Sequence, residues 1–188
     1  MRYSCCFTGY RPHRFEFSAH GLRPEHVQRA LAQLIERLYA EGYRDFYSGM
    51  CIGVDLWAAQ AVAELAQRDP SVRLIGVVPF EGQDTYWSMT DRRTYRRLID
   101  LCAQVITVCT PEEAKQDAAA CYRRRNRYMV DCCDAVLAVY TADGADSRSG
   151  TGATVRYARR QQKRILYIHP ETLRTAEETV HQLQFPME

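Results

Sequence analysis

Residues 46–59 of the chain read FYSGMCIGVDLWAA. An apolar, aromatic run ends at Ser48-Gly49, and apolar side chains recur at helical spacing after Gly53, so the stretch predicts a strand, a glycine turn and a helix. A helix that opens just past a strand directs unpaired N–H groups and a positive dipole end into the crevice above a parallel sheet, where phosphates bind. We therefore predict a nucleotide-type ligand here, with Asp55 either capping the helix or contacting the ligand.

Strand-like and helix-like runs alternate along the rest of the chain. We expect strands at residues 4–8, 45–48, 72–79, 105–109, 135–140 and 165–168, and helices at residues 24–40, 54–67, 91–102, 122–133, 153–161 and 175–184. This alternation predicts an α/β fold with a doubly wound, mostly parallel sheet and helices on both faces, in a single domain over residues 1–188. Ligands of such folds bind at the carboxyl ends of the strands.

The composition is that of an ordinary globular chain: 188 residues, 46% hydrophobic and 26% charged, with a net charge of +2. That charge does not demand a nucleic-acid partner. No apolar run is long enough to span a membrane and the N-terminus lacks a signal-peptide pattern, so we expect a cytoplasmic protein with no membrane partner. Eight cysteines include no Cys-x-x-Cys pair, and the five histidines show no ligand spacing, so no metal site, structural disulfide or catalytic triad is predicted.

The stretch SGTGATV follows the fifth expected strand and opens a helix, which makes it a second predicted anion site. The backbone of Gly150 and the hydroxyls of Thr151 and Thr154 are placed to donate to a phosphate. Arg148 and Arg156 flank the stretch and favour an anionic ligand. The alternative is a polar loop over residues 143–152 that ends in a threonine cap.

Two further strand ends contribute predicted ligand contacts. At the end of the first strand, Arg11 is placed to grip a phosphate with two hydrogen bonds. The loop after the third strand holds a carboxylate, an amide and the ring of Trp87, which suit a ribose or a base; packing of the ring under the loop is the alternative. The predicted contacts at these two ends are Thr8, Gly9, Arg11, Glu81, Gln83 and Trp87.

Residues 122–128 read YRRRNRY, a dense basic run whose usual interpretation is a solvated helix face. Interleaved tyrosines and arginines can also contact nucleic acid. On a helix, however, Arg123 and Arg127 share a face and Arg125 projects elsewhere, which splits the basic patch and speaks against a nucleic-acid partner. Asn126 is expected to point into the crevice instead.

The chain also carries five segments that are informative together: CFTGYR at residues 6–11, SGM to GVDLWAA at 48–59, PFEGQ at 79–83, RNRYMVD at 125–131, and Gly150-Thr151 with Thr154-Val155 and Tyr157-Ala158. Their order and spacing resemble the YpsA-like proteins of the SLOG superfamily, which includes the DNA-processing protein DprA and the LOG phosphoribohydrolases. The resemblance covers residues 5 to about 168. It implies a bacterial, Rossmann-like domain that binds a nucleotide or a nucleotide-derived ligand, such as ADP-ribose or NAD, as a sensor or regulator.

The resemblance leaves other functions open. LOG enzymes cleave a nucleotide N-glycosidic bond with the glutamate of a Gly-Gly-x-Gly-Thr-x-x-Glu motif. Matching Gly150-Thr151 to that motif puts Ala153 or Thr154 at the acidic position, and neither side chain can act as a general base. The carboxylates available to a hydrolase of this kind would be Glu81, Asp55 and Asp131. A DNA- or protein-interaction module, as in DprA, is the third alternative, and a homo-oligomer is left open.

Overall fold

The computed structural model describes residues 2–15, 17, 19, 21–141 and 149–179. Its strands are β1 (Tyr3–Gly9), β2 (Tyr43–Ser48), β3 (Arg73–Val78), β4 (Gln104–Thr107), β5 (Ala135–Val139), β6 (Arg164–Ile168) and β7 (Thr175–Glu178). Its helices are α1 (Pro24–Ala40), α2 (Val54–Arg68), α3 (Met89–Asp100), α4 (Pro111–Cys132) and α5 (Gly150–Arg160), with a short 3₁₀ turn, η1 (Pro12–Arg14).

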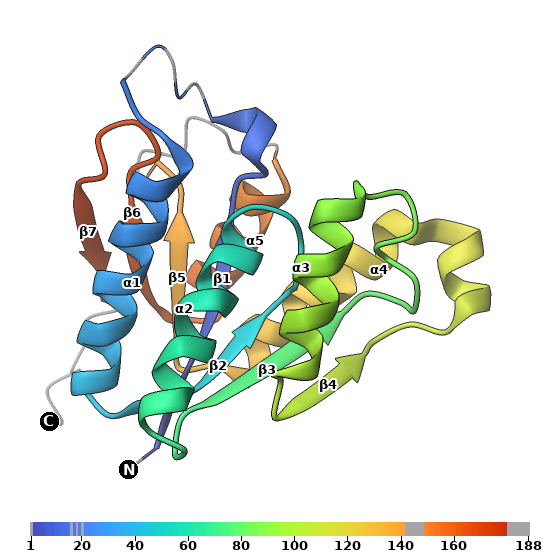
Figure 1. Ribbon diagram of the computed structural model, residues 1–188, viewed down its shortest axis with the longest axis horizontal. Coiled ribbons are helices and arrows are strands. Elements are labelled where there is room, and N and C mark those ends of the chain that lie inside the picture. The colour runs from blue at the N-terminus through green and yellow to red at the C-terminus, as the bar shows by residue number, and fades with distance from the viewer. Residues whose placement is uncertain (1, 16, 18, 20, 142–148, 180–188) are drawn as a thin grey trace, which may run out of the picture.

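Within the described residues, the strands form one seven-stranded sheet in the order β4-β3-β2-β1-β5-β6-β7 (Figure 1). Neighbouring strands are parallel except for β6 and β7, which are antiparallel. The predicted α/β fold with a mostly parallel sheet is therefore confirmed.

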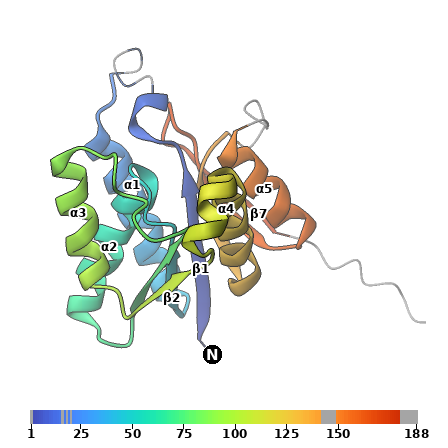
Figure 2. The ribbon, with the colours of Figure 1, turned by 90° about the vertical axis from the view of Figure 1, so that its right-hand side faces the viewer.

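Helices cover both faces of this sheet, as Figure 2 shows edge-on, with α1, α2 and α3 on one side and α4 and α5 on the other. Each face has its own hydrophobic core. Leu31 of α1 and Leu98 of α3 belong to the first core, which includes Phe46 of β2. Met129 of α4 and Val155 of α5 belong to the second core. The doubly wound arrangement follows from these two apolar layers.

Helix α4 begins earlier than the sequence pattern indicated. We expected it to start at Tyr122, but it starts at Pro111, after a reciprocal cap in which Thr110 Oγ1 accepts from the Glu113 N–H at 3.3 Å and Glu113 Oε2 accepts from the Thr110 N–H at 2.9 Å. This capping box, with proline in the first turn, is a helix-start signal that the prediction missed. The helix then kinks at Asp117, where φ is −151° and ψ is 86°.

The helix predicted over residues 175–184 is wrong in its described part, because β7 pairs with β6 there. Glu177 of β7 accepts hydrogen bonds from Arg37 Nη2 and Arg164 Nε, both at 2.8 Å. The backbone hydrogen bonds between β7 and β6, together with these ion pairs, stabilise a strand here more than the weak helical pattern of the sequence stabilises a helix. The remainder of the predicted range lies outside the described residues.

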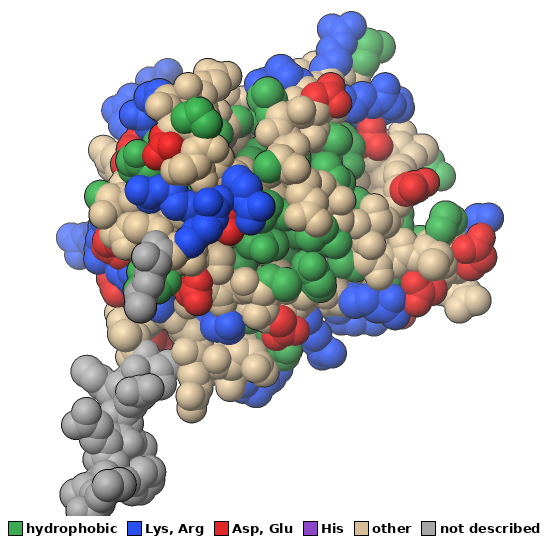
Figure 3. Space-filling model, turned by 90° about the horizontal axis from the view of Figure 1, so that it is seen from below, with side chains coloured by type: hydrophobic (Ala, Val, Ile, Leu, Met, Phe, Trp, Pro, Cys, Tyr) green, Lys and Arg blue, Asp and Glu red, His purple; other side chains and the backbone are tan. Residues whose placement is uncertain are grey.

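The order of the strands reverses beside β1. From β1 the chain passes through α1 to β2 and then outward to β3 and β4, and α4 brings it back to β5 on the other side of β1. A reversal of this kind opens a crevice above the carboxyl ends of the two central strands, which is where ligands of such sheets bind. Figure 3 shows the molecule from the opposite, lower end, where basic and acidic side chains border a hydrophobic area.

Candidate functional site

A pocket of about 320 Å³ lies at the carboxyl end of β1, beside the starts of α2 and α5; we call it the switch-point pocket. The predicted site residues that line it are Thr8, Gly9, Arg11, Asp55, Asn126, Gly150 and Thr151. Its lining also includes Tyr10, His13, Arg14, Cys51, Tyr122, Arg125 and Ser149, which the sequence did not mark as site residues. Four segments that lie far apart in the chain, after β1, before and at the start of α2, in α4 and at the start of α5, thus meet at one pocket.

Arg125 connects α4 to the start of α2, and it is almost completely buried, with 5% of its surface exposed. Its Nη1 donates to Asp55 Oδ2 at 3.0 Å and its Nη2 donates to Cys51 Sγ at 3.3 Å. The Nε atom is buried and has no hydrogen-bond partner. A sequence signal was available, because Cys121, Arg125 and Met129 follow one another at intervals of four and form one buried stripe of α4.

Arg125 and Asp55 affect each other's pKa. Burial alone would lower the pKa of the Arg125 guanidinium, but the neighbouring Cys51 and Asp55 outweigh burial and raise that pKa. Burial raises the pKa of the Asp55 carboxyl, and Arg125 and Arg11 act against this rise. The guanidinium therefore remains a cation inside the pocket wall, which favours an anion nearby.

Ser48 and Gly49 shape the loop after β2 and do not line the pocket. The Ser48 hydroxyl donates to the carbonyl of Asp55 at 2.9 Å and accepts from the Met50 N–H at 3.1 Å. At Gly49, an added Cβ would lie 1.1 Å from Arg125 Nη1. Glycine is thus required at position 49 because the buried guanidinium occupies the space of a side chain.

Gly53 precedes α2 with a φ of 98°, and a Cβ there would lie 2.6 Å from the carbonyl oxygen of Tyr10. That same carbonyl accepts from the N–H of Val54 at 3.4 Å, the first N–H of the helix. Asp55 Oδ2 accepts from the Cys51 N–H at 3.4 Å. The Tyr10 carbonyl and the Asp55 carboxylate therefore occupy the start of α2. Because Gly53 has no side chain, the loop after β1 can approach this helix closely.

The start of α5 forms the other wall of the pocket. Of the polar loop expected before this helix, residues 150–152 form its first turn and residues 143–148 lie outside the described residues. Thr154 Oγ1 donates to the Gly150 carbonyl at 2.9 Å and accepts from Asn126 Nδ2 at 3.0 Å. Asn126 thus ties α4 to the first turn of α5, while Gly150 and the buried Thr151 face the pocket.

Two aromatic rings, those of Tyr10 and Tyr122, also line the pocket. Burial raises the pKa of the Tyr122 hydroxyl, and the charges of Arg11 and Arg125 act against this rise. The guanidinium carbon of Arg125 lies 5.9 Å from the centre of the Tyr122 ring. Tyr10 also lines the pocket, so basic and aromatic groups stand side by side within it.

The predicted contacts after β3 lie away from this pocket. The buried Gln83 donates from Nε2 to the carbonyl of Met50 at 3.4 Å and so supports the loop after β2. The ring of Trp87 packs edge-on against Tyr95 with 5.3 Å between the ring centres. Glu81 is exposed to solvent. None of the three lines the switch-point pocket.

Three further features of the described residues are reported with the site. No group of three His, Cys, Asp or Glu side chains in residues 2–15, 17, 19, 21–141 and 149–179 is arranged to hold a metal ion. No helix in the same part of the chain is long and apolar enough to cross a membrane. All eight cysteines are free thiols.

Comparison with known proteins supplies the family. Residues 5–173 match the family model of YpsA, described as the YspA SLOG family. A UPF0398 protein of Halalkalibacterium halodurans is 29% identical over 143 residues, which cover 76% of this chain and 74% of that protein. The SPbeta prophage-derived protein YoqJ of Bacillus subtilis is 29% identical over 152 residues, covering 76% of this chain and 86% of YoqJ. Because the family model spans most of the residues, from β1 to the loop before β7, the chain belongs to the YpsA family of SLOG proteins.

Proposed function

We propose that this protein binds a nucleotide or a nucleotide-derived ligand in the switch-point pocket and acts as a sensor or regulator. The observation that carries the proposal is the meeting of the first turn of α5 with the guanidinium of Arg125, whose buried Nε has no partner, at one pocket. The first turn of α5 and the Arg125 guanidinium can both donate to one phosphate group, because helix starts and guanidinium groups each favour a bound anion.

The remaining lining suits the other parts of a nucleotide. The rings of Tyr10 and Tyr122 offer faces on which a base can stack, and Asn126 and Thr8 offer polar atoms for a ribose. A volume of about 320 Å³ lies at the lower end of the range for small-molecule pockets. These features favour a ligand of nucleotide size over a long polymer.

The positions of the candidate carboxylates favour a ligand-binding function over a hydrolase function. Asp55 is the one carboxylate among the described residues of the pocket lining, and it is already held by Arg125 and by the Cys51 N–H. A general base must reach within about 3 Å of its proton, and these ties restrain Asp55 from doing so. Glu81 does not line the pocket, and Asp131 accepts from the Tyr157 hydroxyl at 2.8 Å on another surface.

A thermal-shift titration tests the proposal, with AMP, ADP, NAD, ADP-ribose and cyclic dinucleotides as probes. A ligand at 100 times its Kd adds about 2.7 kcal/mol of stability, which corresponds to roughly 5–10 °C in a chain of this length. We expect Arg11→Ala to abolish the shift. Arg93→Ala removes the same charge from an exposed position of α3 and should retain it.

The result that would overturn the proposal is the absence of a shift with every probe up to millimolar concentration. Chromatography of the same mixtures after long incubation tests the hydrolase alternative separately. Unchanged probes that nevertheless raise the melting temperature support a binding protein, while release of free base would make the protein an enzyme.

A further inference from the structure

A second pocket, of about 210 Å³, lies between α4 and α5; we call it the arginine pocket. Its lining is Arg123, Asn126, Arg127, Gly150, Ala153, Thr154, Arg156, Tyr157 and Arg160. Four guanidinium groups thus gather around one hollow, and none of the described lining residues is a carboxylate. Such a concentration of like charge favours a bound anion.

Two of these arginines are held in place by a tyrosine ring. The guanidinium carbons of Arg127 and Arg160 lie 5.6 and 5.7 Å from the centre of the Tyr157 ring. The ring is itself fixed, because the Tyr157 hydroxyl donates to Asp131 Oδ1 at 2.8 Å. Neither Arg127 nor Arg160 forms an ion pair with a described residue. Stacking on the ring leaves their N–H groups available and reduces the entropy lost when they bind an anion.

The arginine pocket adjoins the switch-point pocket. Asn126 and Gly150 line both of them, and the hydrogen bond from Asn126 to Thr154 runs along the shared wall. The first turn of α5 therefore stands between the two hollows. Because the two pockets share Asn126 and Gly150, a single ligand held against these residues is placed to contact both.

On this basis, and resting on the proposed function, we propose that the ligand carries two separate phosphate groups. One lies in the switch-point pocket near Arg125, and the other lies in the arginine pocket near Arg127 and Arg160. The chemical class that fits is a nucleoside phosphorylated at both its 5′ and its 3′ or 2′ position, in place of a nucleoside with a single phosphate group.

The arrangement of the basic residues favours this ligand over a nucleic-acid strand. Arg125 is buried, and Arg123 forms an exposed ion pair with Asp117 at 3.2 Å. Arg124 bonds Glu113 Oε1 at 2.8 Å and the carbonyl of Val108. The basic run of α4 is therefore divided between partners and forms no continuous track for a phosphate backbone.

Isothermal titration with matched probes tests the inference. Each nucleoside 5′-monophosphate is compared with the corresponding 3′,5′-bisphosphate at 150 mM salt, using the wild-type protein and the Arg127→Ala/Arg160→Ala double variant. One additional charge-assisted contact corresponds to about tenfold in affinity or more. We expect the wild-type protein to bind one bisphosphate at least about tenfold more tightly than its monophosphate, and the variant to lose this preference without weaker binding of the monophosphate.

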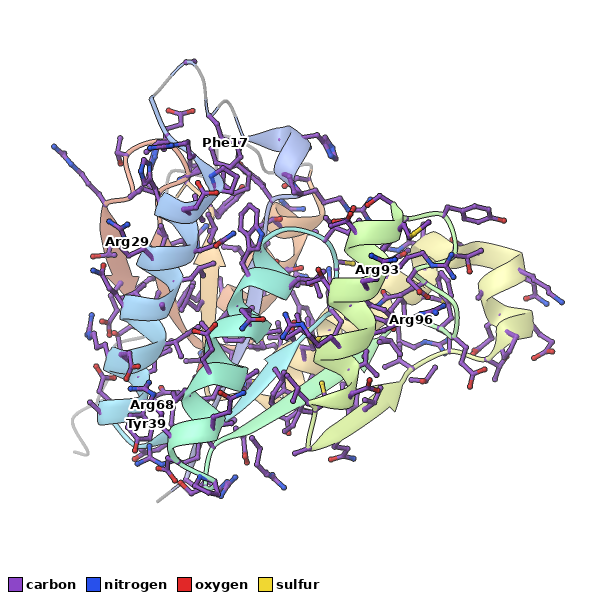
Figure 4. All side chains as sticks on the ribbon, in the orientation of Figure 1. Phe17, Arg29, Tyr39, Arg68, Arg93 and Arg96 are labelled. Carbon is purple, nitrogen blue, oxygen red and sulfur yellow. The ribbon has the colours of Figure 1, made fainter. Side chains whose placement is uncertain are left out.

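A matched control removes charge from the other side of the sheet. Figure 4 labels Arg29 on α1 and Arg93 on α3, both exposed, and Arg29→Ala/Arg93→Ala has the same net charge as the test variant. The control should keep the full preference for the bisphosphate, which excludes a general effect of net charge.

The outcomes separate the inference from the function on which it rests. Equal binding of monophosphate and bisphosphate would overturn the second phosphate site and leave the proposed function standing. Binding of neither class by the wild-type protein would overturn the inference, and the proposed function would fall with it only if none of the thermal-shift probes raises the melting temperature. Binding of oligo-dT that depends on Arg127 and Arg160, with no preference among nucleotides, would also overturn the inference and identify the arginine pocket as a nucleic-acid surface.

Discussion

Arg125 of α4 donates to Asp55 of α2 across 3.0 Å, inside the protein, and so joins two helices that cover opposite faces of the sheet. The side chains of the pair are only 6% and 10% exposed. The pair lies beyond the carboxyl end of β2, where the loop after this strand leads into α2. It is both a wall of the switch-point pocket and a tie between the two halves of the fold.

Removing one partner of this pair should be costly. Arg125→Met leaves the Asp55 carboxyl buried without its cation, and the loss of such a partner typically costs about 3–5 kcal/mol. The double variant Asp55→Leu/Arg125→Met should regain most of that stability, because no buried charge is left over. Urea unfolding measures both, and equal loss in the single and double variants would refute the argument.

A surface pair provides the control for that experiment. Arg68 and Glu36 form an ion pair with side chains that are 61% and 48% exposed. Glu36→Gln should change the free energy of unfolding by less than about 1 kcal/mol, since exposed ion pairs contribute little.

Gly49→Ala should destabilise the protein through the same pair. The new methyl group would overlap Arg125 Nη1, 1.1 Å away, so the guanidinium must leave its position. We expect a loss of about 3 kcal/mol or more in chemical unfolding, from overpacking together with a weakened buried ion pair. Gly150→Ala is the matched control, because nothing lies within 4 Å of a Cβ there. A loss at position 150 as large as at position 49 would contradict this explanation.

Stability should depend on pH through Asp45. Burial alone would raise the pKa of this carboxyl, but hydrogen bonds from the guanidinium groups of Arg2 and Arg73 lower it from 3.8 to about 2. A lowered pKa stabilises the fold above pH 3.8, and this contribution is lost as the pH falls from 3.8 towards 2. Asp45→Asn should therefore cost about 1–2 kcal/mol at pH 7. The stabilities of the two proteins should converge near pH 2, and a constant difference over the whole range would disprove the linkage.

Glu81→Gln should leave ligand binding unchanged. The side chain is exposed and does not line the switch-point pocket, although the sequence placed it among the ligand contacts and the hydrolase carboxylates. The affinity for whichever nucleotide shifts the melting temperature should stay within about twofold, since surface changes away from a site have small effects. A loss of affinity above tenfold would contradict this expectation and show that the loop after β3 contributes to ligand binding.

The sequence was sufficient for the sheet and most helices, because buried parallel strands are continuous apolar runs and helices repeat with a period near four. It was insufficient at the last strand. β7 is polar and exposed over most of its length, and only pairing with β6 and with distant arginines such as Arg37 makes it a strand. Interactions of this kind are not visible in a local pattern.

The site shows the same limit. The glycines and hydroxyls near the strand ends could be found because each follows a strand directly. The spacing of Cys121, Arg125 and Met129 marks Arg125 as the buried arginine of its basic run, but its contact with Asp55, 70 positions away, is not visible in a local pattern. Gly49 was marked for ligand approach, whereas its contact in the structure is with that arginine.

The antiparallel strand β7 also shields the edge of β6 from pairing with another copy of the chain. All but the first residue of β6 are buried, and β7 covers the outer edge of that strand with a short, acidic segment. Without it, β6 would present an apolar row of unpaired N–H and C=O groups onto which another copy of the chain could add a strand. We therefore expect β7 to limit aggregation. A chain that ends before Thr175 should self-associate under conditions in which it is still folded.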